Sequence, residues 1–303
     1  MNCIKTGFMG SVKLSMVALQ TIVEFGINVD IVFSLDESVS ENVSDYYPIH
    51  KYAEQKNIDY VKFIKVGDVV EDMKREKLDY LFVIGISQLI PSNIIKLIKR
   101  FCIGFHPTSL PRYRGRAPIP WMILLGETNP MITIFKLDSG VDSGDIIFQE
   151  PYVIEKHDYA NDVYGKVEEA LRKGLSKSLS DIYKKNTMFV KQEKEIATYL
   201  LKRIPSDGEI KWSEMDGQEI YTLIRAVSYP YPGAYTIYGG IVVKIDRASL
   251  VPNKRYFGKS GQIAKLENDL IYVLTRDDKL LIIEKKTIES KERINFSVGG
   301  RFY

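Results

Sequence analysis

One loop of the sequence concentrates residue types suited to acid–base and anion chemistry. The run "FHPTSLPRYRGRAP", residues 105–118, holds one of the chain's three histidines together with three arginines and three prolines. Proline fixes φ, and Gly115 permits a conformation that other residues resist, so we expect a stiff, specifically shaped loop. Histidine is a common general acid or base in enzymes, which makes His106 a candidate acid–base group. The alternative is a structural histidine in a rigid surface loop.

A second run supplies carboxylates. "FKLDSGVDSGDIIFQ", residues 135–149, contains Asp138, Asp142 and Asp145 among glycines and serines. An EF-hand calcium loop would need a final Glu and a spacing that are both missing, and a solvated turn is the other alternative. Both runs follow expected strands of one sheet, so we expect them to face one crevice. A carboxylate there would orient an imidazole and stabilise the imidazolium.

The elements that must position these groups alternate between strand and helix signals. Such alternation predicts an α/β fold of Rossmann-like type, a mostly parallel sheet with helices on both faces. Ligands of such sheets bind beyond the carboxyl ends of the strands, where the His106 loop begins. Strands are expected at residues 1–7, 27–35, 79–86, 101–105 and 131–137, and helices at 13–25, 48–56, 69–77, 92–100 and 158–186.

The periodicity changes near residue 203. Turn signals in "PSDG" and "YPYPG", with short alternating runs such as "GIVVKI" and "KLLIIE", predict a small β-rich domain. The expected division is therefore residues 1–203 for the domain that bears both chemical runs and residues 204–303 for the β-rich domain.

Composition narrows the class of protein. The chain has 303 residues, 45% of them hydrophobic and 27% charged, which is ordinary globular composition. Its net charge of +3, from 42 basic and 39 acidic residues, does not indicate a general nucleic-acid surface. Two cysteines form no disulfide framework, and no apolar run is long enough to cross a membrane. We therefore expect a cytoplasmic protein without membrane contact, and the lack of a Cys/His cluster predicts no metal site.

The two runs together resemble the folate-dependent formyltransferases, the family that includes the methionyl-tRNA, glycinamide ribonucleotide and sugar N-formyltransferases. The matching residues are His106–Pro111 with Arg114–Gly115, and Asp138–Ile146. The interval of 36 residues from His106 to Asp142 is similar to the family's. "RIPSDGEIKW" and "IRAVSYPYPGAYT" resemble the region where such chains enter a small open, OB-like barrel. The resemblance implies a formyltransferase catalytic domain followed by that barrel.

The resemblance also implies a reaction: transfer of a formyl group from the co-substrate 10-formyltetrahydrofolate to a primary amine, with no metal. His106 would bind the oxyanion or carry the amine proton, and Asp142 would orient His106. The pterin is expected in a mainly apolar slot. The cofactor-binding residues implied are Val83, Gly85, Ile86, Leu89, Ile90, Leu137, Asp138, Gly140 and Val141.

One position departs from the family pattern. The family carries Asn two residues before the histidine, and this chain has Gly104 there. Glycine cannot donate a side-chain hydrogen bond to an oxyanion, and such a loss costs about a hundredfold or more in rate. Ser87 and Gln88, at the end of a strand, are the candidate catalytic replacements. The alternative for this pair is an ordinary strand-to-helix turn.

The acceptor is expected to be a nucleotide-linked amino sugar, because arginines bind phosphate oxygens and "RGRAPIPW" resembles the amino-sugar enzymes. The run "GFMGS", residues 7–11, could cradle a phosphate, but it lacks the G-x-G-x-x-G spacing of a dinucleotide site, which favours a tight strand-to-helix turn. The first alternative is a methionyl-tRNA formyltransferase, the one case with a nucleic-acid partner, and the second is a noncatalytic folate- or nucleotide-binding protein. The sequence leaves the assembly open, a homodimer included. The substrate-binding candidates are Gly10, Ser11, Thr108, Arg112, Arg114, Arg116 and Trp121.

Overall fold

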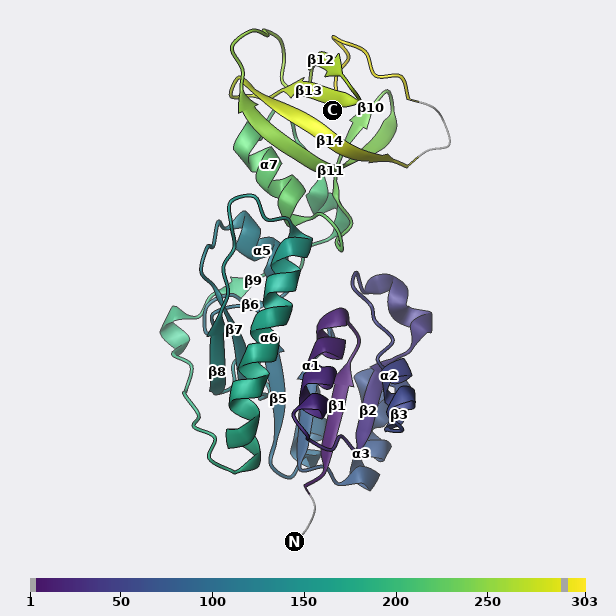
Figure 1. Ribbon diagram of the computed structural model, residues 1–303, viewed down its shortest axis with the longest axis vertical. Helices are drawn as coiled ribbons and strands as arrows, with labels where there is room; N and C mark the ends of the chain where they lie inside the picture. Colours follow the sequence, from purple (N-terminus) through teal and green to yellow (C-terminus); the bar gives the residue numbers. More distant parts are fainter. Residues whose placement is uncertain (1–3, 290–293) are drawn as a thin grey trace. The chain divides into compact units, whose positions relative to one another are not determined.

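The computed structural model describes residues 4–289 and 294–303 (Figure 1). The chain packs into two compact units. The first comprises Met1–Pro118, Thr128–Val153 and Tyr164–Leu201, and the second comprises Ile119–Glu127, Ile154–Val163 and Lys202–Tyr303. Two short segments from before residue 203 thus join the second unit, an interleaving that the sequence pattern does not reveal. The proposed domain boundary at residue 203 stays a prediction.

The first unit is built on a seven-stranded sheet of order β3-β2-β1-β4-β5-β7-β8. The first five of these strands run parallel, whereas β5–β7 and β7–β8 are antiparallel pairs. The predicted mostly parallel α/β sheet is confirmed. The strands are β1 (Thr6–Gly10), β2 (Ile31–Leu35), β3 (Asp59–Phe63), β4 (Tyr80–Ile84), β5 (Phe101–His106), β7 (Met131–Lys136) and β8 (Ile146–Pro151).

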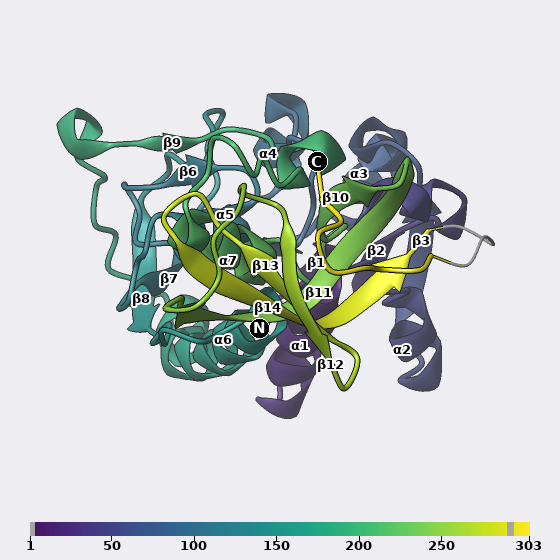
Figure 2. The ribbon, with the colours of Figure 1, turned by 90° about the horizontal axis from the view of Figure 1, so that it is seen from above.

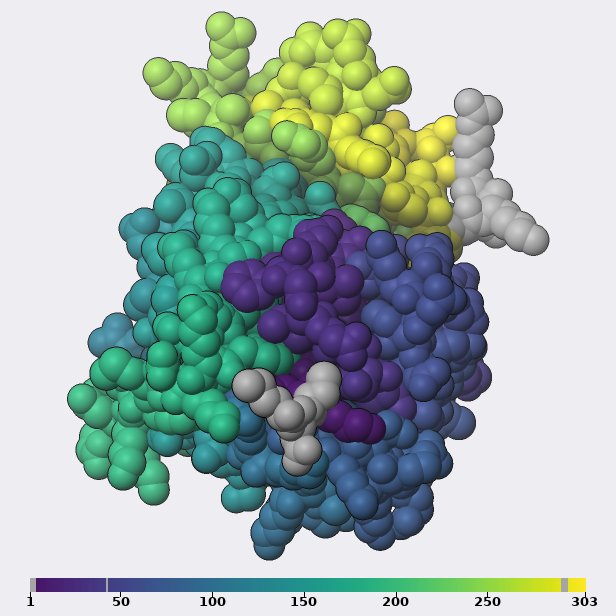
Figure 3. All heavy atoms as spheres, turned by 60° about the horizontal axis from the view of Figure 1, so that its bottom comes forward, coloured from purple at the N-terminus to yellow at the C-terminus, as the bar shows by residue number. Residues whose placement is uncertain are grey.

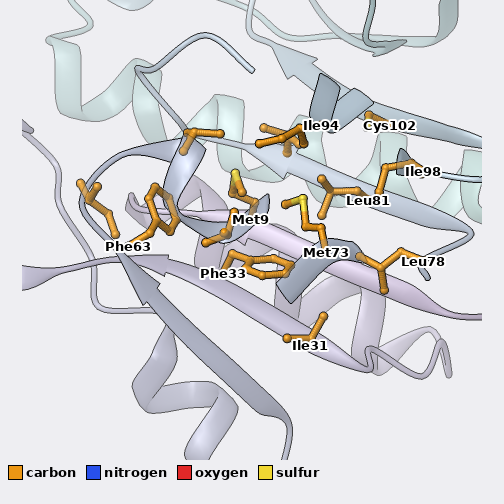
Figure 4. Close-up of a cluster of buried hydrophobic side chains, with 14 residues drawn as sticks. Met9, Ile31, Phe33, Phe63, Met73, Leu78, Leu81, Ile94, Ile98 and Cys102 are labelled. Carbon is orange, nitrogen blue, oxygen red and sulfur yellow. The ribbon is translucent and has the colours of Figure 1, made fainter. Parts of the chain in front are cut away.

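Helices cover both faces of this sheet. Successive strand residues point to opposite sides, and the central strands are buried throughout, so both faces need an apolar cover. On one face the Tyr80 hydroxyl donates to the carbonyl of Ile182, in the last turn of the long helix α6. On the other face Leu81 joins Met9 and Phe33 in a buried cluster that α3 and α4 close with Met73 and Ile94 (Figure 4). The helices are α1 (Lys13–Glu24), α2 (His50–Gln55), α3 (Val70–Glu76), α4 (Ser92–Leu97) and α6 (Ala160–Tyr183), with 3-10 turns at Glu37–Asn42, Val66–Val69 and Lys194–Ile196. A further 3-10 turn, Pro205–Gly208, belongs to the second unit.

The space-filling view shows how closely one face of the first unit is covered. In Figure 3 the purple N-terminal part of the chain is packed between the green and blue parts, in agreement with the place of α1 between α6 and α2 in Figure 1. Of α1, Leu19 and Ile22 are fully buried. The helix predicted at residues 13–25 therefore packs its apolar side chains into the interior of the unit.

Two elements of this unit have weak sequence signals. β3 lies at the sheet edge and buries only Phe63, so its sequence has no run of buried apolar residues. β6 (Arg114–Gly115) and β9 (Tyr199–Leu200) form a separate two-stranded parallel ribbon. Both views show these two labels side by side (Figure 2). The ribbon joins the His106 loop to the segment that follows α6.

The second unit contains a five-stranded antiparallel sheet of order β10-β11-β14-β13-β12, as predicted for a β-rich C-terminal domain. Its helix α7 (Gly217–Ala226) begins with a capping box, since Asp216 and Glu219 each accept a hydrogen bond from the other's backbone N–H. The remaining elements are α5 (Pro118–Leu124), β10 (Ala234–Tyr238), β11 (Ile241–Pro252), β12 (Ile263–Glu267), β13 (Leu270–Leu274) and β14 (Lys279–Ile288). No helix in the described ranges has the length and apolar content that spanning a bilayer requires.

Candidate active site

His106 is the last residue of β5, and the residue is 5% exposed. Its Nε2 lies 2.8 Å from the carbonyl oxygen of Tyr113. A carbonyl oxygen only accepts, so Nε2 carries a proton and donates. The other ring nitrogen, Nδ1, is therefore left for chemistry.

The loop that follows is stiff for the reasons that the sequence suggests. Gly115 has a φ of +112°, and a Cβ at this position would strike the backbone of Leu200. Thr108 is fully buried, and its hydroxyl lies 3.1 Å from the carbonyl oxygens of both Arg112 and Tyr113. Thr108 thus shapes the loop from inside. This geometry gives no support to its expected substrate contact.

Asp142 meets His106 across this loop. Its Oδ2 lies 3.8 Å from His106 Nδ1 and accepts a hydrogen bond of 2.9 Å from the backbone N–H of Gly115. Asp142 lies in the turn between β7 and β8, residues 137–145, which we call the Asp142 turn. Asp138 organises this turn, because its Oδ1 accepts hydrogen bonds from Gly140 N and Ser143 Oγ. The structure therefore brings the two predicted catalytic residues together and places Asp138 and Gly140 inside the turn.

The reason given for this meeting needs correction. β7 is antiparallel to β5, with His106 opposite Thr133 and Ile103 opposite Lys136, so the two strands end at opposite edges of the sheet. The two residues meet because the turn after β7 reaches back toward His106. A bond from Lys136 N to Asp145 O closes the base of this turn.

The three arginines of the loop have different environments. Arg114 is 3% exposed, and its guanidinium donates to Gln192 Oε1 at 2.7 and 3.1 Å and to the Tyr199 hydroxyl at 3.3 Å. Arg112 and Arg116 are exposed, and Arg116 donates to the Ser87 carbonyl at 2.6 Å. Only the two exposed arginines are open to an anion. The expectation that Arg114 binds substrate phosphate finds no support in its buried contacts.

The predicted replacements for the missing asparagine lie at the end of β4. Gln88 accepts from Val66 N at 2.9 Å and donates to Ile64 O at 2.8 Å, so its amide braces a neighbouring loop. Ser87 is exposed. At Gly104 itself, an added Cβ would lie 2.6 Å from Leu137 Cδ2 and 2.9 Å from Phe135 Cζ. The space that a side chain would need at residue 104 is thus filled by other side chains.

The residues expected around the folate divide into two groups. Val83 belongs to the buried apolar cluster, and Ile86, Ile90 and Leu137 pack against it while partly exposed. Leu89 and Val141 are well exposed, with no place in that cluster. The Gly85 carbonyl oxygen accepts a hydrogen bond from the hydroxyl of Ser11. The first group is the more suitable lining for an apolar slot.

The run "GFMGS" forms the end of β1 and the turn into α1, and hydrogen bonds within the turn favour a structural role for it. Ser15 Oγ accepts from the backbone N–H groups of Ser11 and Val12, both at 3.1 Å, and donates to Ile84 O. These two N–H groups are occupied within the turn, so they are not free to bind a phosphate. Trp121 belongs to the second unit, where the Arg203 guanidinium lies 5.1 Å from its ring centroid.

Sequence reasoning missed Gln192, which contacts Arg114 and the Asp142 turn. It lies 50 residues beyond Asp142, in a segment without helical or strand periodicity, so no pattern singled it out. Within the described residues, no group of three His, Cys, Asp or Glu side chains is placed to hold a metal. The arrangement offers proton transfer at Nδ1 of His106 beside a carboxylate, at the end of a strand in an open α/β sheet. This fold and arrangement are suited to an enzyme that uses acid–base chemistry.

Comparison with known proteins gives the family. The model "Formyl transferase" matches residues 24–179, and "Formyl transferase, C-terminal domain" matches residues 203–298. The methionyl-tRNA formyltransferase of Mycoplasma capricolum is 31% identical over 289 residues, covering 93% of this chain and 90% of that protein. That of Clostridium tetani is 28% identical, covering 95% and 93%. The chain belongs to the formyl transferase family, as the two motifs predicted.

Structural comparison agrees on the fold. The N-formyltransferase of Helicobacter canadensis, in complex with folinic acid and dTDP-3-aminofucose, superposes with a TM-score of 0.71. The identity is 18%, with 92% of this chain and 98% of that chain covered. The chain is thus a formyltransferase with the catalytic fold and the C-terminal domain of its relatives.

Proposed function

We propose that this enzyme transfers the formyl group of 10-formyltetrahydrofolate to the primary amine of a nucleotide-linked amino sugar. Membership of the formyl transferase family supports the reaction type. The folate is supported by the folinic acid in the Helicobacter canadensis structure. The partly exposed side chains of Ile86, Ile90 and Leu137 offer an apolar surface for the pterin.

His106 and Asp142 carry the chemistry in this proposal. The acceptor amine attacks the formyl carbon, and a new N–C bond forms to give a tetrahedral intermediate. Nδ1 of His106 takes the amine proton, and Asp142, 3.8 Å away, stabilises the imidazolium. The bond between the carbon and the folate nitrogen then breaks, and the proton passes to that nitrogen. The products are the formamide and tetrahydrofolate.

The oxyanion needs a donor, because Gly104 has no side chain. Gln88 is held on both sides of its amide by backbone groups, which disfavours it. The Ser87 hydroxyl is exposed and follows the strand beside β5. Protonated His106 is the other donor. Both remain parts of the proposal.

The charge at the carboxyl ends of the strands favours a nucleotide-linked amino sugar over tRNA as the acceptor. The connection from β2 to α2, residues 36–49, contains four carboxylates and no Lys or Arg. It lies on the edge where β1, β2 and β4 end, since Gly10 pairs with both Ser34 and Ile84. Lys62 pairs with one of these carboxylates, Glu37, at 3.0 Å, and the balance of this segment stays acidic. Such a rim repels a polyanion, whereas a single pyrophosphate needs only the exposed Arg112 and Arg116.

A methionyl-tRNA acceptor is the second candidate, and two observations favour it. The curated relatives named above are methionyl-tRNA formyltransferases that match over most of this chain. Residues 202–303 also hold 17 Lys and Arg against 13 Asp and Glu, so the net positive charge lies in the C-terminal part. Phosphate contacts by such a surface would make binding strongly salt-dependent.

One experiment separates the candidates. The purified protein is incubated with 10-formyltetrahydrofolate and either a panel of dTDP- and UDP-linked amino sugars or initiator methionyl-tRNA, and products are identified by mass spectrometry. We expect a formylated amino sugar at a rate that changes little between low and high salt. Formylation of the tRNA alone, with a steep loss in salt, would establish the second candidate. Folate binding without product in either arm would leave a noncatalytic protein, and His106→Ala controls for contaminating activity.

A further inference from the structure

The segment after α6 connects the two halves of the candidate site. We call residues 187–201 the strap. At one end, Val190 and Ile146 exchange backbone hydrogen bonds of 2.8 and 2.9 Å, just after the Asp142 turn. At the other end, Arg114 N donates to Thr198 O and Arg116 N to Leu200 O, which forms the β6–β9 ribbon visible in Figure 2. The strap thus bridges the Asp142 turn and the His106 loop.

Gln192 lies between these two anchors, with 9% of its surface exposed. Its Oε1 accepts from Arg114 Nη2 at 2.7 Å and Nε at 3.1 Å. Its Nε2 donates to the carbonyl oxygens of Asp142 at 2.9 Å and Gly144 at 2.6 Å. A guanidinium only donates and a carbonyl only accepts, so the amide has one possible orientation. All of its donors and acceptors are in use.

These contacts act on the conformation of Asp142. Its φ is +48°, a left-handed conformation that a residue with a Cβ adopts at a cost. Gln192 bonds the carbonyl of Asp142 itself, and Gly115 N bonds its carboxylate. Fixed at both points, the carboxylate can face His106 Nδ1.

Arg114 completes the network. No carboxylate lies within ion-pair distance of Arg114 in the described ranges, so Gln192 takes the place that an acidic partner would hold for this buried cation. The positive charge of Arg114 beside the Gln192 side-chain oxygen polarises the amide. This strengthens the hydrogen bonds that the amide N–H groups donate. Arg114 therefore supports the Asp142 turn through Gln192.

We infer that Gln192 is the positioning residue of the reaction: it holds the carboxylate of Asp142 toward His106. This inference rests on the proposed function, in which Asp142 is the partner of His106. Gln192 is not a catalytic residue, because it acts through Asp142.

The test uses Gln192→Glu, which changes one NH₂ group to an oxygen. The carboxylate keeps an acceptor for Arg114, but it has no donor for the carbonyl oxygens of Asp142 and Gly144 and repels them. We expect kcat to fall about 100-fold, the effect of a misplaced reacting group. The KM for 10-formyltetrahydrofolate should stay within about threefold, since a transition-state interaction is lost. Gln192→Met, which removes donor and acceptor at similar volume, should show the same loss and serves if the Glu variant does not fold.

A double-mutant cycle separates positioning from general damage. In the Asp142→Asn background, Gln192→Glu should lower kcat by no more than about twofold further, because residues that act as a unit are not additive. Gln262→Glu is the matched control: Gln262 accepts from Lys259 N and donates to Gly299 O in the second unit. It should leave kcat unchanged.

The outcomes are distinct. A full additional 100-fold loss in the Asp142→Asn background, or wild-type kcat in folded Gln192→Glu and Gln192→Met, would overturn the inference. Near-wild-type kcat in Asp142→Asn alone would instead overturn the proposed function. A large loss in the control would mean that a Gln→Glu change at any amide bonded to backbone groups on both sides damages the enzyme, which also contradicts the specific role of Gln192.

Discussion

Two buried histidines of the first unit, His50 and His106, are 4% and 5% exposed, and each has a carboxylate neighbour. His50 uses both ring nitrogens at hydrogen-bond distance: Nδ1 lies 3.3 Å from Ser34 Oγ and Nε2 lies 3.0 Å from Glu37 Oε1. His106 uses one, because its Nδ1 lies 3.8 Å from Asp142.

We infer from this difference that His50 has a structural role and that His106 is available for acid–base chemistry. A ring nitrogen occupied by a protein partner is less available for proton exchange with a substrate than one held just beyond bonding distance of a carboxylate. Burial and a neighbouring acid do not distinguish the two histidines. The feature that distinguishes them is Nδ1 of His106, which lies 3.8 Å from its carboxylate neighbour and therefore beyond hydrogen-bond distance. The predictions below test this distinction.

The largest expected effect is on turnover. His106→Ala and Asp142→Asn should each lower kcat by about 10²- to 10⁴-fold, the usual contribution of a positioned acid–base group. Steady-state kinetics with the acceptor found in the panel give the measurement. His50→Ala is the matched control and should keep kcat within about twofold. Comparable losses in all three variants would erase the distinction between the two histidines.

Substitutions at Gly104 test whether this position could accept the asparagine that the family carries there. Gly104→Asn should destabilise the protein by about 1–3 kcal/mol through overpacking against Phe135 and Leu137, and kcat should not rise. Gly104→Ala is the control, because it adds the same Cβ without an amide. Urea unfolding and kinetics measure both effects. A kcat above wild type in the Asn variant, but not in the Ala variant, would mean that the chain simply lacks a donor.

The structural role of His50 predicts a smaller effect on stability. His50→Ala should lower the free energy of unfolding by about 1–2 kcal/mol, because Ser34, itself fully buried, loses the shorter of its two hydrogen bonds and keeps only that to Leu35 O at 3.4 Å. Urea unfolding measures it, with His50→Gln as the variant that retains a polar partner and most of the volume. An unchanged midpoint for the Ala variant would show that the His50 contacts contribute nothing to the fold.

The sequence predicted the sheet class and the His106–Asp142 pair, because long apolar runs and two motifs in register are local signals. It could not predict that β7 runs antiparallel, since strand direction depends on pairing partners that no local pattern identifies. The burial of Arg114 was hidden in the same way, because its partner Gln192 is 78 residues away. Helix α7 was missed although Asp216 and Glu219 form a capping box that the sequence displays.

The smallest expected effect is a pH dependence of stability. Burial lowers the pKa of His50, an effect that the Glu37 carboxylate partly opposes. The unfolded chain takes up a proton near pH 6.5, whereas the folded state resists it, so the unfolded state binds more protons on acidification. The contribution of His50 is therefore complete above pH 6.5 and is lost as the pH falls through the lower folded value.

The difference between wild type and His50→Gln isolates this contribution, because Glu37, Lys62, Glu54 and Lys51, whose charges act on His50, remain in both proteins. Unfolding free energies from urea titrations between pH 7.5 and pH 5, a range chosen to bracket the ordinary histidine value of about 6.5, should fall more steeply for wild type. A shallower fall for wild type would mean that Glu37 holds His50 protonated and that its charge outweighs burial. His50 would then resemble an imidazolium–carboxylate pair, the state that we assign to His106 only during the reaction.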